Sequence, residues 1–253
     1  MHELQVRCPS VSVQRRIASI LGSYDDLIEV NRRRTAVLEE MAQRLFQKWF
    51  VEFRYFSNSE PIAGSEPTSL PAGWTWGRLD DLLLLQRGFD LPSDKRSPGP
   101  HPVISASGVH GYHSVAKVKG PGVVTGRSGT IGEVILIQED FWALNTTLYV
   151  SEFRRATPIF AFFVLRNLSL KDRGGGAAVP TLNRNHIHGL KTVIPSTDAI
   201  VRFGEFASPL FQLIRVYDLQ QARLSASRDL LLPRLISGEL SVIAAEREIE
   251  QAA

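Results

Sequence analysis

Apolar side chains recur every seven residues in two long stretches of the chain, and this pattern constrains the fold more than any other feature. The first stretch runs from Ser12 to about Phe53 without a proline, and only Gly22 interrupts it. Its recurring positions are Ile17, Tyr24, Asn31, Leu38 and Leu45, with Ile20, Leu27 and Met41 three places further on. Such a repeat is typical of the apolar seam of a coiled coil. About 40 residues at 1.5 Å each predict a rod of roughly 60 Å, which needs a second helix to bury its seam.

A second stretch near the C-terminus repeats the first at a constant offset of 186 residues. Its recurring positions are Phe203, Leu210, Tyr217, Leu224 and Leu231, supported by Phe206 and Leu213. In the same register Pro9 falls on Pro195 and Ser10 on Ser196, so each copy is predicted to hold a strand end, a proline turn and a long helix. Any two amphipathic helices align at heptad spacing, but the matching Pro-Ser entrance favours an internal duplication. Pro209 predicts a bend or a later start in the second helix.

The connections predict that the two helices pair in antiparallel fashion. The first helix leads into the central part of the chain and the second begins where that part ends, so these two helix ends lie at the same pole. The expected pairing positions are Ile17, Tyr24, Asn31, Leu38 and Leu45 of the first helix and Leu210, Tyr217, Leu224 and Leu231 of the second. We expect Asn31 and Tyr217, which share a repeat position near both midpoints, to approach one another and help to fix the register. The alternative is that Asn31 faces solvent.

The chain between the two helices has a different character. Residues 57–73 are rich in Pro, Ser and Gly and are predicted to form a linker. From Trp74 onward the short apolar runs "HPVISA", "PGVVTG", "GEVILI", "TTLYVSEF" and "GLKTVIP" alternate with turns and predict strands. One helix is expected from Pro158 to Leu168, followed by the loop "KDRGGGAAVP".

These patterns predict an α+β fold in which a mainly β domain is flanked by two long antiparallel coiled-coil helices. The expected boundaries are 1–56 for the strand end, proline turn and first helix, 57–73 for the linker, 74–197 for the β-rich domain, 198–240 for the second helix and 241–253 for a tail.

The amino-acid composition indicates a globular protein and limits the cellular compartment in which the chain is expected to act. Its 253 residues are 43% hydrophobic, which is ample for a packed core, and Cys8 is its only cysteine, so no intramolecular disulfide can form. No apolar run approaches the roughly 20 residues that span a bilayer, and we expect a soluble, cytoplasmic protein without a membrane partner. The net charge is +3, and residues 74–196 hold 14 lysines and arginines against 9 aspartates and glutamates. A basic solvated surface and a nucleic-acid face both explain this excess.

A glycine-rich stretch, "GPGVVTGRSGTIGEVILI", surrounds a single arginine, Arg127. The glycine spacing differs from that of a phosphate-binding loop, no lysine follows, and the stretch ends in a predicted strand, so we exclude a nucleotide site. The pattern predicts a β-hairpin with Arg127, Ser128 and Thr130 at its tip. An arginine in that place forks onto guanine or phosphate, whereas the alternative is a purely structural turn.

Catalytic patterns are missing from the sequence. His186 and His188 are two residues apart, without the cluster that a zinc site needs, and Cys8 has no local signature of a nucleophile. "DLPSDK", residues 90–95, contains an acid and a lysine, but no second carboxylate and lysine follow in a strand. We therefore expect no catalytic residue, no metal and no cofactor.

Polar residues gathered near the predicted turns supply the donor and acceptor set that base recognition requires. The candidate DNA-binding residues are Lys95, Arg96, His113, Lys117, Arg127, Ser128, Thr130, Asn145, Thr146, Asn183, Arg184 and His186. Each of them alone is also explained as a solvated loop residue.

Together these stretches resemble the specificity subunit of type I restriction-modification systems. "PSVSVQRRIASILGSYDDLIEVNRRRTAVLEEMAQRLFQKWFVEF" is similar to the central helical region of that family, and "LPAGWTW" is similar to the start of a target recognition domain. "GRSGTIG", "FWALNTTLYV" and "LNRNHIHGLKTVIPS" resemble stretches inside and at the end of such a domain. Full-length members alternate two recognition domains with two helical regions, so the chain resembles the second half with its shared spacer, as a truncated product or a half-subunit.

The resemblance implies that the chain binds one half-site of double-stranded DNA and carries out no chemistry of its own. It further implies that the helices set the spacing between half-sites and dock the modification subunits, which carry S-adenosylmethionine and methylate adenine, and that a restriction subunit, a motor nuclease, joins the complex. One alternative is a coiled-coil assembly scaffold that binds modification subunits without reading DNA. A homodimer that restores two recognition domains is a related hypothesis.

Overall fold

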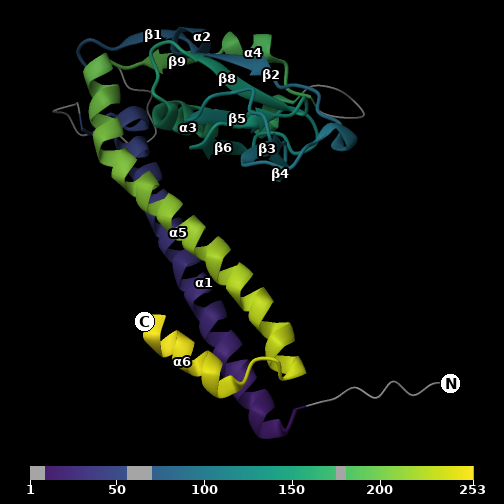
Figure 1. Ribbon diagram of the computed structural model, residues 1–253. Helices are drawn as coiled ribbons and strands as arrows, with labels where there is room; N and C mark the ends of the chain where they lie inside the picture. The colour runs from purple at the N-terminus through teal and green to yellow at the C-terminus, as the bar shows by residue number, and fades with distance from the viewer. Residues whose placement is uncertain (1–8, 56–69, 175–180, 253) are drawn as a thin grey trace. The chain divides into compact units, whose positions relative to one another are not determined.

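The computed structural model describes residues 9–55, 70–174 and 181–252, which form two compact units (Figure 1). The first unit comprises residues 1–42 and 209–253, and the second comprises residues 43–208. The expected strand end before the first helix and most of the expected linker lie outside the described residues. Among the helices that the structure describes, none combines the length and the apolar content needed to cross a membrane.

Both predicted long helices are present. Helix α1 spans Val11–Phe46 and continues as a short π-helix, Gln47–Val51, and helix α5 spans Thr197–Ser237. Pro209 lies inside α5, so the predicted later start of this helix is wrong; the proline removes a single backbone hydrogen bond from a helix of 41 residues. The segment expected as a tail forms a third helix, α6, at Val242–Ala252.

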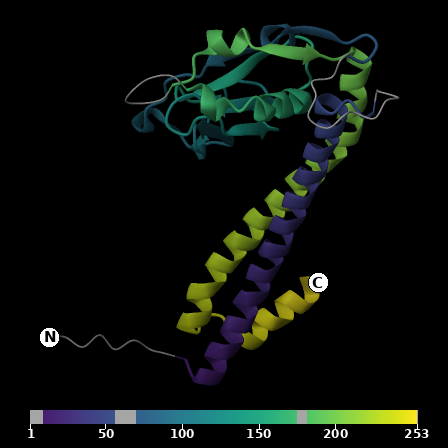
Figure 2. The same cartoon turned by 180° about the vertical axis from the view of Figure 1, so that it is seen from behind.

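Side-chain contacts in the first unit confirm the antiparallel pairing of α1 and α5, which lie side by side in Figures 1 and 2. Arg228 forms an ion pair with Asp25 at 2.6 Å, and the guanidinium of Arg34 lies 5.5 Å from the ring centroid of Tyr217. Asn31 is buried and donates to Gln220 at 3.3 Å, so the alternative that it faces solvent is wrong. Its hydrogen-bond partner lies three residues beyond Tyr217, the residue that we expected.

The buried side of both helices differs from the predicted seam in the same way. The seven-residue positions are buried or half-buried, and Ile20, three places after Ile17, is buried as predicted. The other residues three places further on, Leu27, Met41, Phe206 and Leu213, are 45–57% exposed. The buried residues lie four places further on, at Ile28, Ala42, Ala207 and Ile214. Positions three and four places along both flank the seam of a helix, and the side on which the partner packs decides between them.

The two helices begin and end with equivalent hydrogen bonds at the 186-residue offset. Ser10 Oγ accepts from the backbone of Val13, and Ser196 Oγ accepts from the backbone of Ala199. At the other ends, the amide of Arg54 donates to the carbonyl of Lys48 and the amide of Leu240 donates to the carbonyl of Arg234, both at 2.9 Å. These matched ends support the internal duplication.

Helix α6 packs against the first turns of α1. Val242 and Ala245 form a buried cluster with Ile17, Ile20 and Leu235. An ion pair between Arg16 and Glu246 lies beside this cluster. The apolar contacts, rather than the exposed ion pair, supply most of the stability of this attachment.

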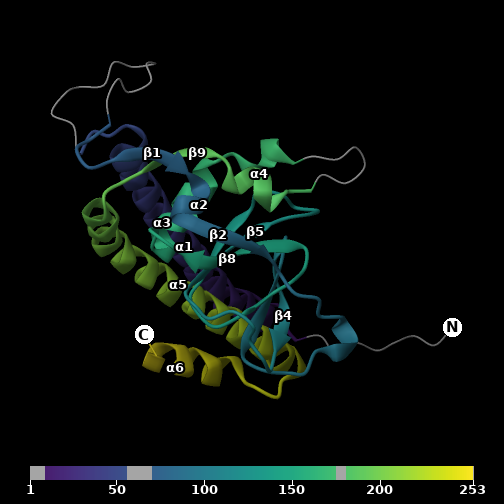
Figure 3. The same ribbon diagram turned by 90° about the horizontal axis from the view of Figure 1, so that it is seen from above.

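The described residues of the second unit form three sheets, and Figure 3 shows strands of this unit from above. The sheets have the strand orders β2-β8-β5-β6, β4-β3-β7 and β1-β9. The strands are β1 Thr75–Arg78, β2 Leu83–Arg87, β3 His101–Ser105, β4 Gly108–His113, β5 Gly122–Gly126, β6 Val134–Ile137, β7 Trp142–Ala143, β8 Thr147–Phe153 and β9 Lys191–Ile194. All five predicted strands are present, as β3, β5, β6, β8 and β9. Of the strands that were missed, β7 has two residues, β2 has no β-branched residue and β4 is rich in glycine and histidine.

The second unit includes the end of α1 and the start of α5, and its other helices are short. They are α2 Leu79–Leu82, α3 Pro158–Asn167, α4 Arg184–His188 and the 3-10 turns η2 Ser93–Lys95 and η3 Leu170–Arg173. The predicted helix at Pro158 is confirmed, with the side chain of Thr157 as its N-cap. Phe163 of α3 stacks on Phe46 at 5.4 Å between ring centroids and meets Phe203 edge-on at 5.7 Å. This aromatic core joins the β sheets to the helical residues of the same unit.

Candidate nucleic-acid interface

The glycine-rich stretch forms the predicted hairpin. Strands β5 and β6 pair in antiparallel fashion, and Gly129 and Gly132 in the connecting loop both have a φ of +81°. A Cβ on Gly126 would lie 1.8 Å from the carbonyl oxygen of Thr130, so only glycine lets the loop fold back so closely. The glycines are therefore scaffold, and they raise Arg127, Ser128 and Thr130 at the tip.

Backbone hydrogen bonds bring three separate segments together at this tip. The amide of Arg127 donates to the carbonyl of Thr146 at 2.8 Å, and the amide of Ser128 donates to the same carbonyl at 3.2 Å. On the other side, the amide of Leu182 donates to the carbonyl of Arg127 at 2.9 Å. The hairpin tip, the turn at 145–146 and the segment that leads into α4 consequently form one surface.

Arg127 is fixed through its backbone and free at its side chain. The side chain is half-buried, and no hydrogen bond or ion pair to its guanidinium occurs within the part of the chain that the structure describes. A guanidinium held on a rigid loop without an internal partner has its donors available for a guanine edge or a phosphate.

The turn at 145–146 is held against the segment that follows β2. A Cβ on Gly88 would lie 2.2 Å from the carbonyl oxygen of Leu144, so glycine is required for this close approach. Arg87 Nε donates to the backbone carbonyl of Asn145 at 3.4 Å, and Asn145 Nδ2 donates to the carboxylate of Asp90. Asp90 thus belongs to the same surface.

A shallow cleft of about 360 Å³ lies beside this turn. Its polar lining comes from Asp90, Ser93, Arg96, His110 and Asn145. Sequence analysis selected Arg96 and Asn145 as candidates but weighed Asp90 only as a nuclease acid. The sequence signal for the contact between Asp90 and Asn145 is Gly88, two residues before Asp90, which permits a close approach to Leu144.

Two of the candidate residues are engaged inside the protein. His113 is 7% exposed, its Nδ1 accepts from the amide of Ser97 at 3.0 Å, and its ring packs edge-on against Trp142. Arg96 donates to the backbone carbonyls of His110 at 2.9 Å and Leu91 at 3.3 Å. These side chains fasten the loop before β3 to β4, which leaves His113 buried and Arg96 half-buried at the cleft.

The other candidates differ in how far their polar groups are exposed. The side-chain oxygen of Asn183 caps α4 by accepting from the amide of Asn185 at 3.0 Å, and Thr146 Oγ1 is buried. Lys117 is exposed and places its ammonium 5.4 Å from the ring centroid of Trp142. The remaining exposed candidates are Lys95, Thr130, Arg184 and His186.

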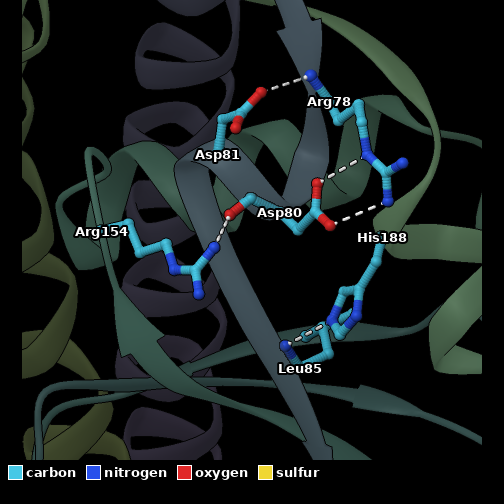
Figure 4. A network of polar contacts seen from close by, with 6 residues as sticks. All are labelled: Arg78, Asp80, Asp81, Leu85, Arg154 and His188. Carbon is cyan, nitrogen blue, oxygen red and sulfur yellow. Dashed lines mark hydrogen bonds and ion pairs between the residues drawn. The ribbon is translucent and has the colours of Figure 1, made fainter.

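A network of polar contacts ties α4 to the sheet beneath the tip. Figure 4 shows its members, Arg78, Asp80, Asp81, Leu85, Arg154 and His188. The guanidinium of Arg78 donates two hydrogen bonds of 2.9 Å to the carboxylate of Asp80, and these bonds lower the pKa of Asp80. His188 Nε2 accepts from the amide of Leu85 at 2.8 Å. This network fixes the segment that carries Arg184 and His186.

His188 is held in its neutral form. Burial lowers its pKa, the carboxylate of Asp80 opposes this shift, and the neighbouring arginines, led by Arg184, add to it. A neutral imidazole is also what the hydrogen bond from Leu85 requires, because a protonated ring has no acceptor. The network is thus structural, and its role at the interface is to place α4.

Two curated proteins are similar to the chain over almost its whole length. No family model matches the chain. Over 96% of its length the chain is 26% identical to the type I restriction enzyme MjaIX specificity subunit of Methanocaldococcus jannaschii, and over 94% it is 22% identical to the type I restriction enzyme HindI specificity subunit of Haemophilus influenzae. The chain is thus similar to type I restriction enzyme specificity subunits.

A solved structure shares the fold of the chain. A crystal structure of the type I restriction-modification S subunit from M. genitalium aligns with 90% of the chain at a TM-score of 0.68 and 16% identity, which shows a shared fold. The chain spans 62% of the M. jannaschii type I specificity subunit, 69% of the H. influenzae one and 61% of the M. genitalium S subunit.

Proposed function

We propose that this chain is a DNA sequence-recognition subunit of a type I restriction-modification complex, which binds one half-site and leaves the chemistry to partner subunits. One observation carries the proposal. Three segments selected separately for base-recognition chemistry share backbone hydrogen bonds around Arg127, whose side chain points to no partner among the described residues. A rigid support with free donors is what direct readout of a base edge needs.

We assign the recognition domain to residues 74–197, the linker to residues 57–73, the spacer helices to residues 1–56 and 198–240, and the tail to residues 241–253. The proposed DNA-binding residues are Lys95, Lys117, Arg127, Ser128, Thr130, Asn145, Thr146, Asn183, Arg184 and His186. Five of these ten side chains are cationic or imidazole groups, in keeping with the local basic excess. The proposed place of action is the cytoplasm, where a chain with a single cysteine needs no disulfide.

Docking of modification subunits is proposed for the outer faces of the paired helices. Leu27 and Val30 are 53% and 41% exposed on α1, and their counterparts at the 186-residue offset, Leu213 and Val216, are 45% and 47% exposed on α5. Two equivalent apolar patches on an internally repeated pair fit two copies of one partner. A restriction subunit would join the assembled complex, and a homodimer of this chain is a further proposed assembly.

The test is to express the chain together with its modification subunits, measure the mass of the complex, and select bound duplexes from a random pool. An enriched sequence supports the proposal, and a palindromic enriched site supports the homodimer in addition. A complex that forms but enriches no sequence contradicts the recognition role and favours the assembly scaffold, for which the exposed patches on α1 and α5 are the motivating observation.

A further inference from the structure

We propose that Asp90 is a positioning residue that sets the orientation of the Asn145 side-chain amide, and that this amide reads an adenine. The inference rests on the proposed function. It concerns the cleft beside the 145–146 turn, where Asn145 Nδ2 donates to the Asp90 carboxylate.

The chemistry of the pair leaves one orientation of the amide. An asparagine amide offers a carbonyl oxygen that accepts and a nitrogen that donates two hydrogens, and both ends have similar shape. A carboxylate can only accept, so it selects the nitrogen and turns it toward Asp90. Asp90 therefore settles which end of the amide is the donor, and a neutral amide in its place would not.

The backbone around Asn145 is held as firmly as its side chain. Its carbonyl accepts from Arg87 Nε at 3.4 Å, and the next residue but one, Thr147, donates from its backbone to the carbonyl of Leu144 at 2.9 Å. The close approach at Gly88 keeps the Asp90 segment in place. A side chain fixed at both ends loses little further freedom on binding.

The groups that remain free match an adenine. After one hydrogen of Nδ2 is given to Asp90, Asn145 keeps one N–H donor and its carbonyl acceptor. The major-groove edge of adenine offers N7 as an acceptor and N6 as a donor, which this pair of groups meets bidentately. Phosphate is the poorer ligand here, because the charge of Asp90 repels it.

The experiment compares four variants of the full chain in its complex, using selection from random duplexes and then binding to the selected site and to single-base changes of it. Asn145→Ala removes the reader, and Asp90→Asn keeps the shape but lets the amide turn over. Asp94→Asn is the matched control for charge, since Asp94 lies exposed in the neighbouring η2 turn. Asn167→Ala, on the exposed last turn of α3, is the control for loss of an amide.

We expect Asn145→Ala to weaken binding of the selected site by about 5- to 150-fold, which corresponds to the loss of one bidentate base contact. Asp90→Asn should relax the preference for adenine at a single position while binding to non-specific DNA stays as strong as with Asp94→Asn. A merely structural role for Asp90 would instead lower binding to all sequences alike.

Three results would overturn the inference. They are an unchanged preference at every position in both Asn145→Ala and Asp90→Asn, a relaxed position that is not adenine, and an equal loss on all sequences. Failure of the proposed function gives a different result, since the unmodified chain would then enrich no sequence at all.

Discussion

Single residues decide what the proposed interface can read, and Arg127 is the first to test. Replacing Arg127 with Ala is expected to weaken specific binding by ~1–3 kcal/mol, because its free guanidinium would lose a bidentate contact to a base. Affinity measured on the selected duplex and on a scrambled one separates this from a phosphate contact, which would weaken both alike. Arg32→Ala, on the exposed face of α1, serves as the control. Equal affinities for Arg127→Ala and the unmodified chain on the selected duplex would remove the role.

His188 gives a prediction about pH. Its pKa is lowered in the folded protein, so the unfolded chain takes up its proton first as pH falls below about 6.5. The stability that neutral His188 contributes is therefore present above that pH and is lost as pH falls toward the lowered pKa. Urea midpoints at pH 7.5 and 5.5 should differ more for the unmodified protein than for His188→Gln. His186→Gln, at an exposed position, should behave as the unmodified protein does.

Sequence alone indicated the types of residue at the interface but not their neighbours. Arg127 and Thr146 meet because the register of β5 with β8 places their loops side by side. Leu182 joins them through the bridge between Ser128 and Thr181, and such pairings are properties of the folded sheet. His113 carries the same ring as the exposed His186, and only packing against Trp142 distinguishes it.

At the scale of elements, the helical seam invites a test with two adjacent residues. Ile28 is 6% exposed and Leu27 is 53% exposed, although the seven-residue pattern favoured Leu27. We expect Ile28→Ala to lower the free energy of unfolding by ~2–5 kcal/mol and Leu27→Ala to change it by well under ~1 kcal/mol. Chemical denaturation of both variants checks this. An equally large decrease in the free energy of unfolding for Leu27→Ala would mean that Leu27 is buried in the helix pair as well.

The elements themselves followed from the sequence more readily than their faces. The long helices and five strands have strong periodic or β-branched patterns, which act locally. The side of α1 that becomes buried depends on where α5 packs, and the same packing decides that Gln220 is the hydrogen-bond partner of Asn31. The sequence of one helix alone therefore predicts neither its buried side nor the partner of Asn31.

For the molecule as a whole, the repeated patches predict the composition of the complex. Replacing Leu27 and Val30 with Asp should remove one modification subunit and leave the other bound, and replacing Leu213 and Val216 with Asp should do the same from the other side. Native mass measurement distinguishes a complex with two partners from one with a single partner. Retention of both partners by each double variant would place the docking surface elsewhere.

The matched caps and closing bonds of α1 and α5 have a further consequence. Residues of α1 have counterparts in α5 186 positions further along, and the two helices have equivalent hydrogen bonds at both ends. Equivalent positions of one chain can therefore be compared with each other. Ile28 and Ile214, buried to within one per cent of each other, form such a pair. Comparing matched substitutions at these two sites then tests how the surroundings of equally buried, equivalent positions differ.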